Sequence, residues 1–417
     1  FSDPDLVYLI ETALANNQEF NIALQDIEIA ANEVKERQSE YLPKVGLGAG
    51  ASYIRPSDNT TEGVLDKITQ RGFYRYPDFN LNLGPSLTWE VDIWRKLRNA
   101  KEAARMRMIA QYEVRNFLIS RLVSEIARNY YELMALDTSL KILDANISIQ
   151  EAAFLKMQLL KRYAKSNQLA VNRFEAQLLG TRSQRFATSQ SIVEKENRLK
   201  FLTGIYVEAP IVRHSEQFMA IPVDELQTGV PAKLLENRAD IRQAEAAIKA
   251  AKLDLKSVKA QLFPNLTISA GAGFSGFSPA LLFRPQSLFY NAAGGLNLPL
   301  INRRGIIARI LMADARQTQT VLNYEQTLLR AYTDVLNEVS NIRNMQQAFE
   351  KKHRQVELLD QSIVIANSLF KYARANYVEV LLTQEEKLNA EKEQVEVKMN
   401  LVGSRIDLYR ALGGGWR

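Results

Sequence analysis

The stretch Leu328–Phe370, LLRAYTDVLNEVSNIRNMQQAFEKKHRQVELLDQSIVIANSLF, decides the fold of this chain. Its apolar residues recur at alternating steps of three and four, the pattern of a helix that packs along its length against other helices. The seam positions are Leu328, Tyr332, Val335, Val339, Ile342, Met345, Phe349, Val356, Leu359, Ile363, Ala366 and Phe370. No Gly or Pro interrupts residues 306–401. One helix over 306–370 would be about 100 Å long at about 1.5 Å per residue.

Composition excludes several kinds of chemistry. The chain has 417 residues, 53 Lys and Arg against 47 Asp and Glu, and no Cys. Without Cys there is no disulfide, Cys-ligated metal or Cys nucleophile. The net charge of +6 is interspersed along helical patterns, which indicates solvated helix faces and does not argue for a nucleic-acid partner. No apolar run is long enough for a membrane-spanning helix. The start at Phe1 suits a removed leader, and a lipid-carrying Cys just upstream would be invisible.

Four segments change to a period of two, in which apolar residues alternate with Gly, Ser, Thr or Asn. They are Val45–Tyr53, Phe79–Ile93, Leu266–Phe274 and Leu288–Leu300. Strands of about ten residues with one apolar and one small or polar face suit the wall of a membrane barrel. Four strands cannot close a barrel, and lipid does not tolerate an open sheet edge. We therefore expect a barrel shared between chains, of eight strands in a dimer or twelve in a trimer.

The remaining segments are predicted to be helices that leave the strands on one side of the membrane. We expect helices over Pro4–Glu40, Lys96–Ala164, 168–202 and Lys233–Leu262, then two more joined by a turn near Ala375–Asn376. The predicted domains are 1–43 (tunnel helix and N-terminal belt), 44–94 (first strand pair), 95–203 (first long hairpin), 204–232 (equatorial belt), 233–263 (tunnel helix), 264–301 (second strand pair), 302–412 (second long hairpin) and 413–417 (C-terminal belt).

The two halves of the chain repeat each other. At an offset of 221 residues, Ala23, Lys35, Pro43 and Gly50 meet Ala244, Lys256, Pro264 and Gly271. At an offset of 209, Arg95, Tyr163, Asn167, Val171 and Gly204 meet Arg304, Tyr372, Asn376, Val380 and Gly413. The difference between the offsets equals the extra length of the first strand-to-strand loop. The repeat is therefore a duplicated unit of helix, strand, loop, strand, long helix, turn and helix.

Enzyme and cofactor signals are weak. Gly271, Gly273 and Gly276 match the spacing of a dinucleotide fingerprint, but a strand pattern surrounds them and Pro279 follows where a helix should start. The two histidines, His214 and His353, have no carboxylate or Cys at metal spacing. We expect no enzyme activity, no metal and no cofactor. A soluble coiled-coil scaffold and a secreted pore-forming protein remain as alternatives.

The whole chain resembles the TolC-like outer-membrane efflux and export channels of Gram-negative bacteria. The resemblance is carried by Asn237-Arg-Ala-Asp-Ile-Arg-Gln-Ala-Glu245, by Leu42-Pro43 and Phe263-Pro264 before the strands, by Trp89-Glu-Val-Asp-Ile-Trp94, and by the second turn, 370–381. It implies a homotrimer with a twelve-stranded barrel in the outer membrane and a periplasmic α-helical tunnel. It also implies a periplasmic adaptor, an inner-membrane pump (of the RND type) and an outward cargo of drugs, metals or proteins. A type I protein secretion channel of the same fold is the alternative.

The resemblance places the working parts at the two hairpin turns. Residues expected to dock the adaptor are Tyr163, Lys165, Asn167, Gln168, Ala375 and Tyr377, and those expected to gate the tunnel are Tyr372, Arg374, Asn376 and Glu379. Leu382 stands where a second acid is often found. The family usually has Gly at Ser166 and Ala375, and we expect Asn167 and Asn376 to supply the left-handed conformation instead.

The aromatic residues Tyr53, Trp89 and Trp94 lie near predicted strand ends. Aromatic rings of membrane barrels collect at the headgroup level, so these three are candidates for anchors in outer-membrane lipid. Simple packing is the equally weighted alternative.

Overall fold

The computed structural model describes residues 3–54, 57, 59–61, 64, 68, 78–205, 210–222, 237–301, 303–372 and 374–415. The chain forms two compact units. Unit 1 contains Phe1–Asp26, Gln111–Gln243 and Glu325–Arg417, and unit 2 contains Ile27–Ala110 and Ala244–Tyr324. Unit 2 thus takes one segment from each half of the chain, as a duplicated sequence requires.

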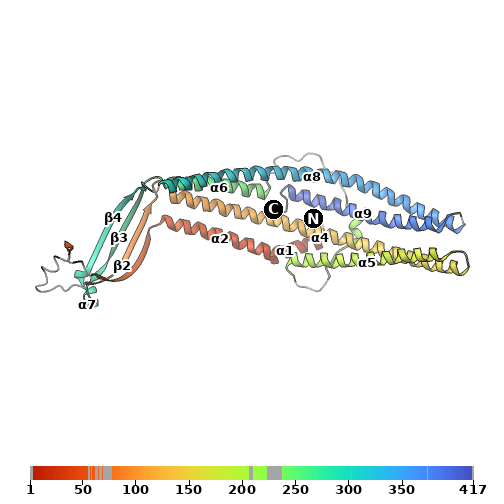
Figure 1. Ribbon diagram of the computed structural model, residues 1–417, viewed down its shortest axis with the longest axis horizontal. Helices are drawn as coiled ribbons and strands as arrows, with labels where there is room; N and C mark the ends of the chain where they lie inside the picture. The colour runs from red at the N-terminus through yellow and green to blue at the C-terminus, as the bar shows by residue number, and fades with distance from the viewer. Residues whose placement is uncertain are drawn as a thin grey trace. The chain divides into compact units, whose positions relative to one another are not determined.

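Unit 2 contains a four-stranded antiparallel sheet in the order β1-β2-β3-β4 (Figure 1). Its strands are β1 (Lys44–Ile54), β2 (Asp78–Val91), β3 (Asn265–Gly276) and β4 (Leu288–Asn297). All four predicted strands are confirmed. β1 and β4 are the edges, and within the described chain no further strand pairs with either.

The register confirms the predicted two faces of the sheet. Side chains directly opposite each other share a face. One such row across the four strands is Val45, Leu87, Ala270 and Ala292, and the adjacent row is Gly46, Ser86, Gly271 and Asn291. The first row is apolar and the second is small or polar. The glycines of the apparent dinucleotide fingerprint therefore lie within β3, which has no long helix after it.

The middle strands approach unusually closely where Gly84 faces Gly273. A Cβ on Gly84 would lie 2.1 Å from the carbonyl oxygen of Ala272, and one on Gly273 would lie 2.3 Å from that of Leu83. Both contacts are to backbone, which cannot rotate away. By contrast, a Cβ on Gly48 in β1 would meet no atom within 4 Å. Close approach of two backbones thus requires glycine in the middle of the sheet and not at Gly48.

Four helices join this sheet at one end, while the strand-to-strand connections lie at the other (Figure 1). They are α2 (Gln18–Tyr41), α4 (Lys96–Arg162), α6 (Ala239–Ala260) and α8 (Arg303–Lys371). The β3–β4 connection contains the short helices α7 (Pro279–Leu282) and η3 (Pro285–Ser287). The one-sided departure of the helices is as predicted. No helix in the described ranges is both long and apolar enough to cross a membrane.

Unit 1 is held together by a core under the middle of α4. It adds α1 (Pro4–Asn16), α5 (Gln168–Thr203), η1 (Ser215–Ala220) and α9 (Tyr377–Ala411). Tyr130 and Phe218 are fully buried at its centre, and the Tyr130 hydroxyl donates to Asp3, the N-cap of α1, at 2.9 Å. Burial and the bond to the Asp3 carboxylate both raise the pKa of Tyr130. The start of the described chain is therefore tied to the core.

The predicted single helix over Pro4–Glu40 is wrong, because it breaks at Asn17. This residue is buried and extended, and its side chain accepts from the N–H of Phe20 at 2.9 Å and donates to the carbonyl of Leu202 at 2.8 Å. Asn17 thus caps α2 and satisfies a carbonyl at the end of α5. The partner 185 residues away is what overrides the local helical pattern.

The long seam of α8 is confirmed with one exception. Val335 and Ile342 pack on Leu401 and Leu408 of α9, within unit 1. Tyr332 is instead 58% exposed, and the neighbouring Ala331 is fully buried in its place. The helix faces its partner there through a small residue, which permits a closer approach than a tyrosine would allow.

Residues near the middle of the chain are fastened to the end of α9 by charged side chains. The buried Lys398 donates to the carbonyl of Ile221 at 2.6 Å, and Arg405 to that of Pro222 at 3.1 Å. Arg238, from the motif at 237–245, donates to the carbonyl of Ala411 at 3.0 Å and pairs with Asp240 at 2.8 Å. Arg238 therefore links the start of α6 to the carbonyl end of α9.

Gly84→Ala tests the close approach in the sheet. The added methyl group must push β2 from β3, so we expect a loss of about 1–3 kcal/mol in the free energy of unfolding. Gly48→Ala is the matched control and should change it by less than about 0.5 kcal/mol. Thermal unfolding in detergent measures both. Equal stabilities for the two variants would contradict the close approach.

Candidate functional site

The first hairpin turn joins α4 to α5 with a left-handed residue followed by a capped helix. Ala164 has φ of 56°, and the N–H of Lys165 donates back to the carbonyl of Leu160 at 2.9 Å. Asn167 is extended, with φ of −118°, and its side chain accepts from the N–H of Ala170 at 2.9 Å. The expectation that Asn167 takes the left-handed conformation is therefore wrong. Asn167 is the N-cap of α5, a role that asparagine fills well.

The second turn repeats this backbone path with a weaker cap. The N–H of Arg374 donates to the carbonyl of Leu369 at 2.9 Å, which is the equivalent bond 209 residues on. Asn376 precedes α9 with φ of −85°, so it is not left-handed either, and its side chain makes no capping bond. The position equivalent to Ala164 lies outside the described residues. The first acidic residue of α9, Glu379, donates its N–H to the carbonyl of Asn376 at 3.1 Å.

The α4–α5 and α8–α9 turns lie at the same end of the helices (Figure 1), and residues beside both turns form one apolar cluster in unit 1. The tip cluster consists of Met157, Ala170, Val171, Phe174 and Leu381, with Ala153, Phe154, Leu160, Phe370 and Tyr377 packed around it. Lys156 of α4 lies over the ring of Phe370 of α8, 5.8 Å from its centre. The sequence predicted the two turns separately. Only the tertiary structure shows that both turns pack on the same cluster.

The predicted gate and docking residues are exposed around the tip cluster. Tyr163 and Tyr372 are 74% and 68% exposed, and Lys165, Asn167, Gln168, Arg374, Asn376 and Glu379 are exposed too, with Ala375 and Tyr377 half-buried. Glu379 and Arg374 form no ion pair with any described residue of their own chain. Lys371 lies over the ring of Tyr372 at 5.9 Å. The carboxylate of Glu379 therefore has no basic side chain paired with it in this part of the structure.

The polar face of the sheet is hollowed by a cavity of about 390 Å³. Its lining contains Asn82, Ser86, Thr88, Asn291 and one aromatic side chain, Phe289, and it contains no charged residue. Ser275 donates to Asn80 at 2.9 Å on the same face. The lining therefore offers hydrogen-bonding groups and no fixed charge.

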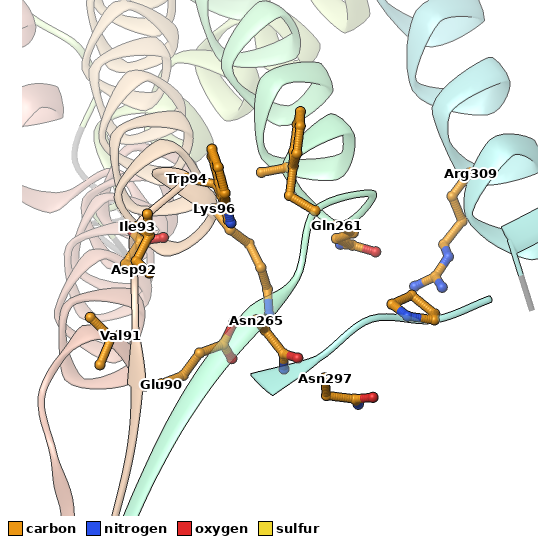
Figure 2. Close-up of a pocket in the computed structure, with 13 residues that line it drawn as sticks. Glu90, Val91, Asp92, Ile93, Trp94, Lys96, Gln261, Asn265, Asn297 and Arg309 are labelled. Atoms are coloured by element: carbon orange, nitrogen blue, oxygen red, sulfur yellow. Dashed lines mark hydrogen bonds and ion pairs between the residues drawn. The ribbon is translucent and has the colours of Figure 1, made fainter. Parts of the chain in front are cut away.

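A second cavity, of about 310 Å³, lies where the strands of unit 2 become helices. Figure 2 shows Lys96 of α4 and Arg309 of α8 among its lining residues, with Asn265 and Asn297. Lys96 pairs with Glu90 at 2.7 Å. Among the residues that the structure describes, no three acidic or histidine side chains are grouped so that they could hold a metal ion.

Asp92 anchors the first long helix to the sheet, a role that the sequence analysis missed. Its buried carboxylate accepts from the N–H of Leu97 at 3.1 Å and of Arg98 at 2.9 Å, and Arg98 pairs with it at 3.2 Å. An Asp just before a predicted helix start was the available signal. The strand alternation hid it, because it assigned Asp92 to the polar face.

The three aromatic candidates for membrane anchors are all at least partly exposed. Trp89 donates its indole N–H to the carbonyl of Tyr41 at 3.1 Å, and Trp94 donates to that of Pro264 at 2.9 Å. Trp94 also stacks on Phe263 at 4.6 Å. These contacts tie strand ends to helix ends. Tyr53 is 66% exposed at the other end of β1. Their position in lipid stays a prediction.

Comparison with known proteins identifies the family. Residues 9–205 and 230–414 match the family model described as "Outer membrane efflux protein". This chain belongs to the outer membrane efflux protein family. The two matched segments correspond to the two halves of the internal duplication. Members of this family are channel proteins, the outer-membrane components of efflux pumps, so the coiled-coil scaffold is excluded.

Individual relatives cover the whole efflux protein chain. "Cation efflux system protein CusC" of Escherichia coli K12 is 25% identical over 100% of this chain and 88% of its own. "Pyoverdine export outer membrane protein OpmQ" of Pseudomonas putida is also 25% identical, over 100% and 87%. The solved structure of the outer membrane protein VceC of Vibrio cholerae superimposes with a TM-score of 0.88, at 22% identity, over 100% and 98%. The last of these shows the fold alone.

These findings establish location and role. The efflux protein lies in the outer membrane with a periplasmic helical extension, and it is the outer-membrane exit duct of a tripartite system. The predicted TolC-like fold is confirmed.

Asn167→Ala and Asn376→Ala form a matched pair that tests the two caps. Asn167→Ala loses a capping bond and should cost about 1 kcal/mol locally, whereas Asn376→Ala has no such bond to lose and should cost a few tenths. Hydrogen exchange at the first amides of α5 and α9 measures each loss. An equal cost at both positions would show that the two turns are capped alike.

Proposed function

We propose that three copies of this efflux protein form a duct that is gated at the hairpin turns and carries small molecules outward. The observation that carries the proposal is the convergence of the two turns on the tip cluster. Around it Tyr372, Arg374 and Glu379 are exposed, and Arg374 and Glu379 have no ion-pair partner within the described part of their own chain. Such groups are available to face other copies or a docked protein. The duct itself performs no catalysis.

The open edges of the sheet support the homotrimer. In lipid every backbone N–H and C=O needs a partner, and β1 and β4 each present an unpaired edge within the described chain. Because the four strands alternate in direction, β4 of one copy can pair antiparallel with β1 of the next. Three copies of four strands then close a twelve-stranded barrel.

The helices carry a second, uncovered apolar stripe that suits the same assembly. Leu179, Phe186 and Val193 recur every seven residues along α5, and all three are exposed. Leu358 and Ile365 are exposed at the same spacing along α8, and Tyr372 follows at that spacing just past the end of the helix. Each stripe lies apart from the seam that packs inside the chain. Stripes at a seven-residue spacing pack against parallel or antiparallel helices, here those of the next copy.

Replacing Phe186 by Glu tests the stripe. A carboxylate buried between copies is costly, so the variant should lose the heat-resistant oligomer on an electrophoretic gel without boiling. The control is Gln184→Glu, an exposed position about 200° around the helix from Phe186, where Lys392 can pair with the added carboxylate. An unchanged oligomer in the Phe186 variant would argue against α5 as an interface.

We infer that the partners are a periplasmic adaptor at the turns and, through it, an inner-membrane pump of the RND type. The exposed residues Tyr163, Lys165, Asn167 and Gln168, with the half-buried Ala375 and Tyr377 beside them, support a protein contact there. The comparisons do not narrow the chemical class of the transported molecule. A relative named for cation efflux and one named for pyoverdine export are both 25% identical to this chain. The uncharged cavity on the sheet supports small molecules rather than proteins.

The gate residue Glu379 has a competing structural role. An acid in the first turn of α9 stabilises the helix by about 0.3–1 kcal/mol through the helix dipole. In a trimer, however, three copies of Glu379 would form a ring whose charges attract cations into the tunnel.

Glu379→Ala separates these roles. Removing the ring should reduce cation selectivity and change conductance of the purified channel in planar bilayers. Leu382→Glu, one turn on, should increase cation selectivity. Glu385→Ala, further along α9, is the control. Unaltered selectivity in the Glu379 variant would leave that residue a purely structural role.

A further inference from the structure

Arg95 is held in an unfavourable backbone conformation at the junction between β2 and α4. Its φ is 60°, in the left-handed region that favours glycine. For a residue with a Cβ this costs about 1–2 kcal/mol. The side chain is exposed and has no carboxylate partner among the described residues. The nearby acids are occupied, since Glu90 pairs with Lys96 and Asp92 with Arg98.

The second repeat places arginine at the equivalent junction. Arg304 corresponds to Arg95 at the offset of 209, and Arg303 precedes it. Both are exposed and, within the described chain, unpaired. Neither α4 nor α8 has an acid in its first turn. Cations near a helix N-terminus are unfavourable by about 0.3–1 kcal/mol, so helix stability does not account for these arginines.

Exposed apolar side chains precede the arginines at both junctions. Ile93 and Trp94, 50% and 46% exposed, come just before Arg95. Leu300 and Ile301, 74% and 94% exposed, come just before Arg303. The order, apolar and then cationic along the path from strand to helix, is the same in both repeats. It matches the change from hydrocarbon to headgroups at a membrane surface.

We propose that this junction surface, formed by Ile93, Trp94, Arg95, Leu300, Ile301, Arg303 and Arg304, binds anionic phospholipids of the periplasm-facing leaflet. The apolar residues contact the acyl chains, and the guanidinium groups bind the phosphates with paired N–H donors. Arginine in place of glycine at residue 95 adds a cation at the headgroup level. The proposal rests on the outer-membrane location and is independent of the gate at the turns.

The positive charge of the junction surface determines which lipid headgroup it prefers. Each cation near a surface favours anionic lipid by a factor of about five, while zwitterionic headgroups give little net attraction. The unpaired arginines of the junction surface thus favour phosphatidylglycerol over phosphatidylethanolamine, and high salt weakens the preference.

The test compares lipid retention by the assembled protein and its variants. Purified protein is equilibrated in detergent with both phospholipids, and native mass spectrometry counts the retained molecules of each. The wild type should prefer phosphatidylglycerol at low salt. Arg95→Gly should reduce this preference about fivefold while its melting temperature stays equal or rises, because glycine suits the backbone. Arg95→Lys should retain the preference.

Further variants distinguish loss of the junction arginines from misfolding and from a general loss of charge. Arg304→Gln leaves residue 95 unchanged and should reduce the preference by a similar factor. The control pair Arg173→Gln and Arg343→Gln removes exposed arginines from α5 and α8 away from unit 2 and should have no effect. The proposal is overturned if the wild type retains both lipids equally, or if the Arg95→Gly and control variants behave alike. Neither result would bear on conductance, so the proposed gate stands or falls separately.

Discussion

Unpaired backbone groups at the two edges of the sheet are the constraint on which the rest of the structure depends. In lipid an unsatisfied N–H or C=O costs several kcal/mol, so β1 and β4 cannot remain edges. Pairing them with other copies requires a regular register, and the register from Lys44 to Asn297 is regular on both faces. The long helices α2, α4, α6 and α8 join the sheet at one end, so the helical extension lies on one side of the membrane.

The two halves of the duplication are similar in path and different in their local bonds. The first long helix is anchored by the buried Asp92, whereas the equivalent position before α8 is Ile301. The first turn has a side-chain cap on Asn167, whereas Asn376 makes none. The second hairpin thus lacks two side-chain bonds that the first hairpin has, the anchor before its first helix and the cap on its second.

Much of the fold could be predicted because its signals are local and repeated. The strand alternation predicted both faces of the sheet, and the seam predicted the face of α8 that packs on α9. The failures share one cause. Asn17 breaks a helix because of a bond to Leu202, and at the seam of α8 Ala331 is buried where the pattern had placed Tyr332. At the turns, Ala164 rather than an Asn is left-handed, because Asn167 is engaged in capping α5. In each case a specific contact outweighs a residue's average preference.

The sequence by itself determined the element order, the duplication, the two-faced strands and the family resemblance, because periodicity and motif spacing are written along the chain. The tertiary structure decided what those elements bring together. It placed both turns on one apolar cluster, paired Gly84 with Gly273, and buried Asp92 as the anchor of α4. It also showed Arg95 in a conformation that its residue type disfavours. These features depend on distances between residues far apart in sequence, or on backbone angles, and neither is encoded in a hydrophobic pattern.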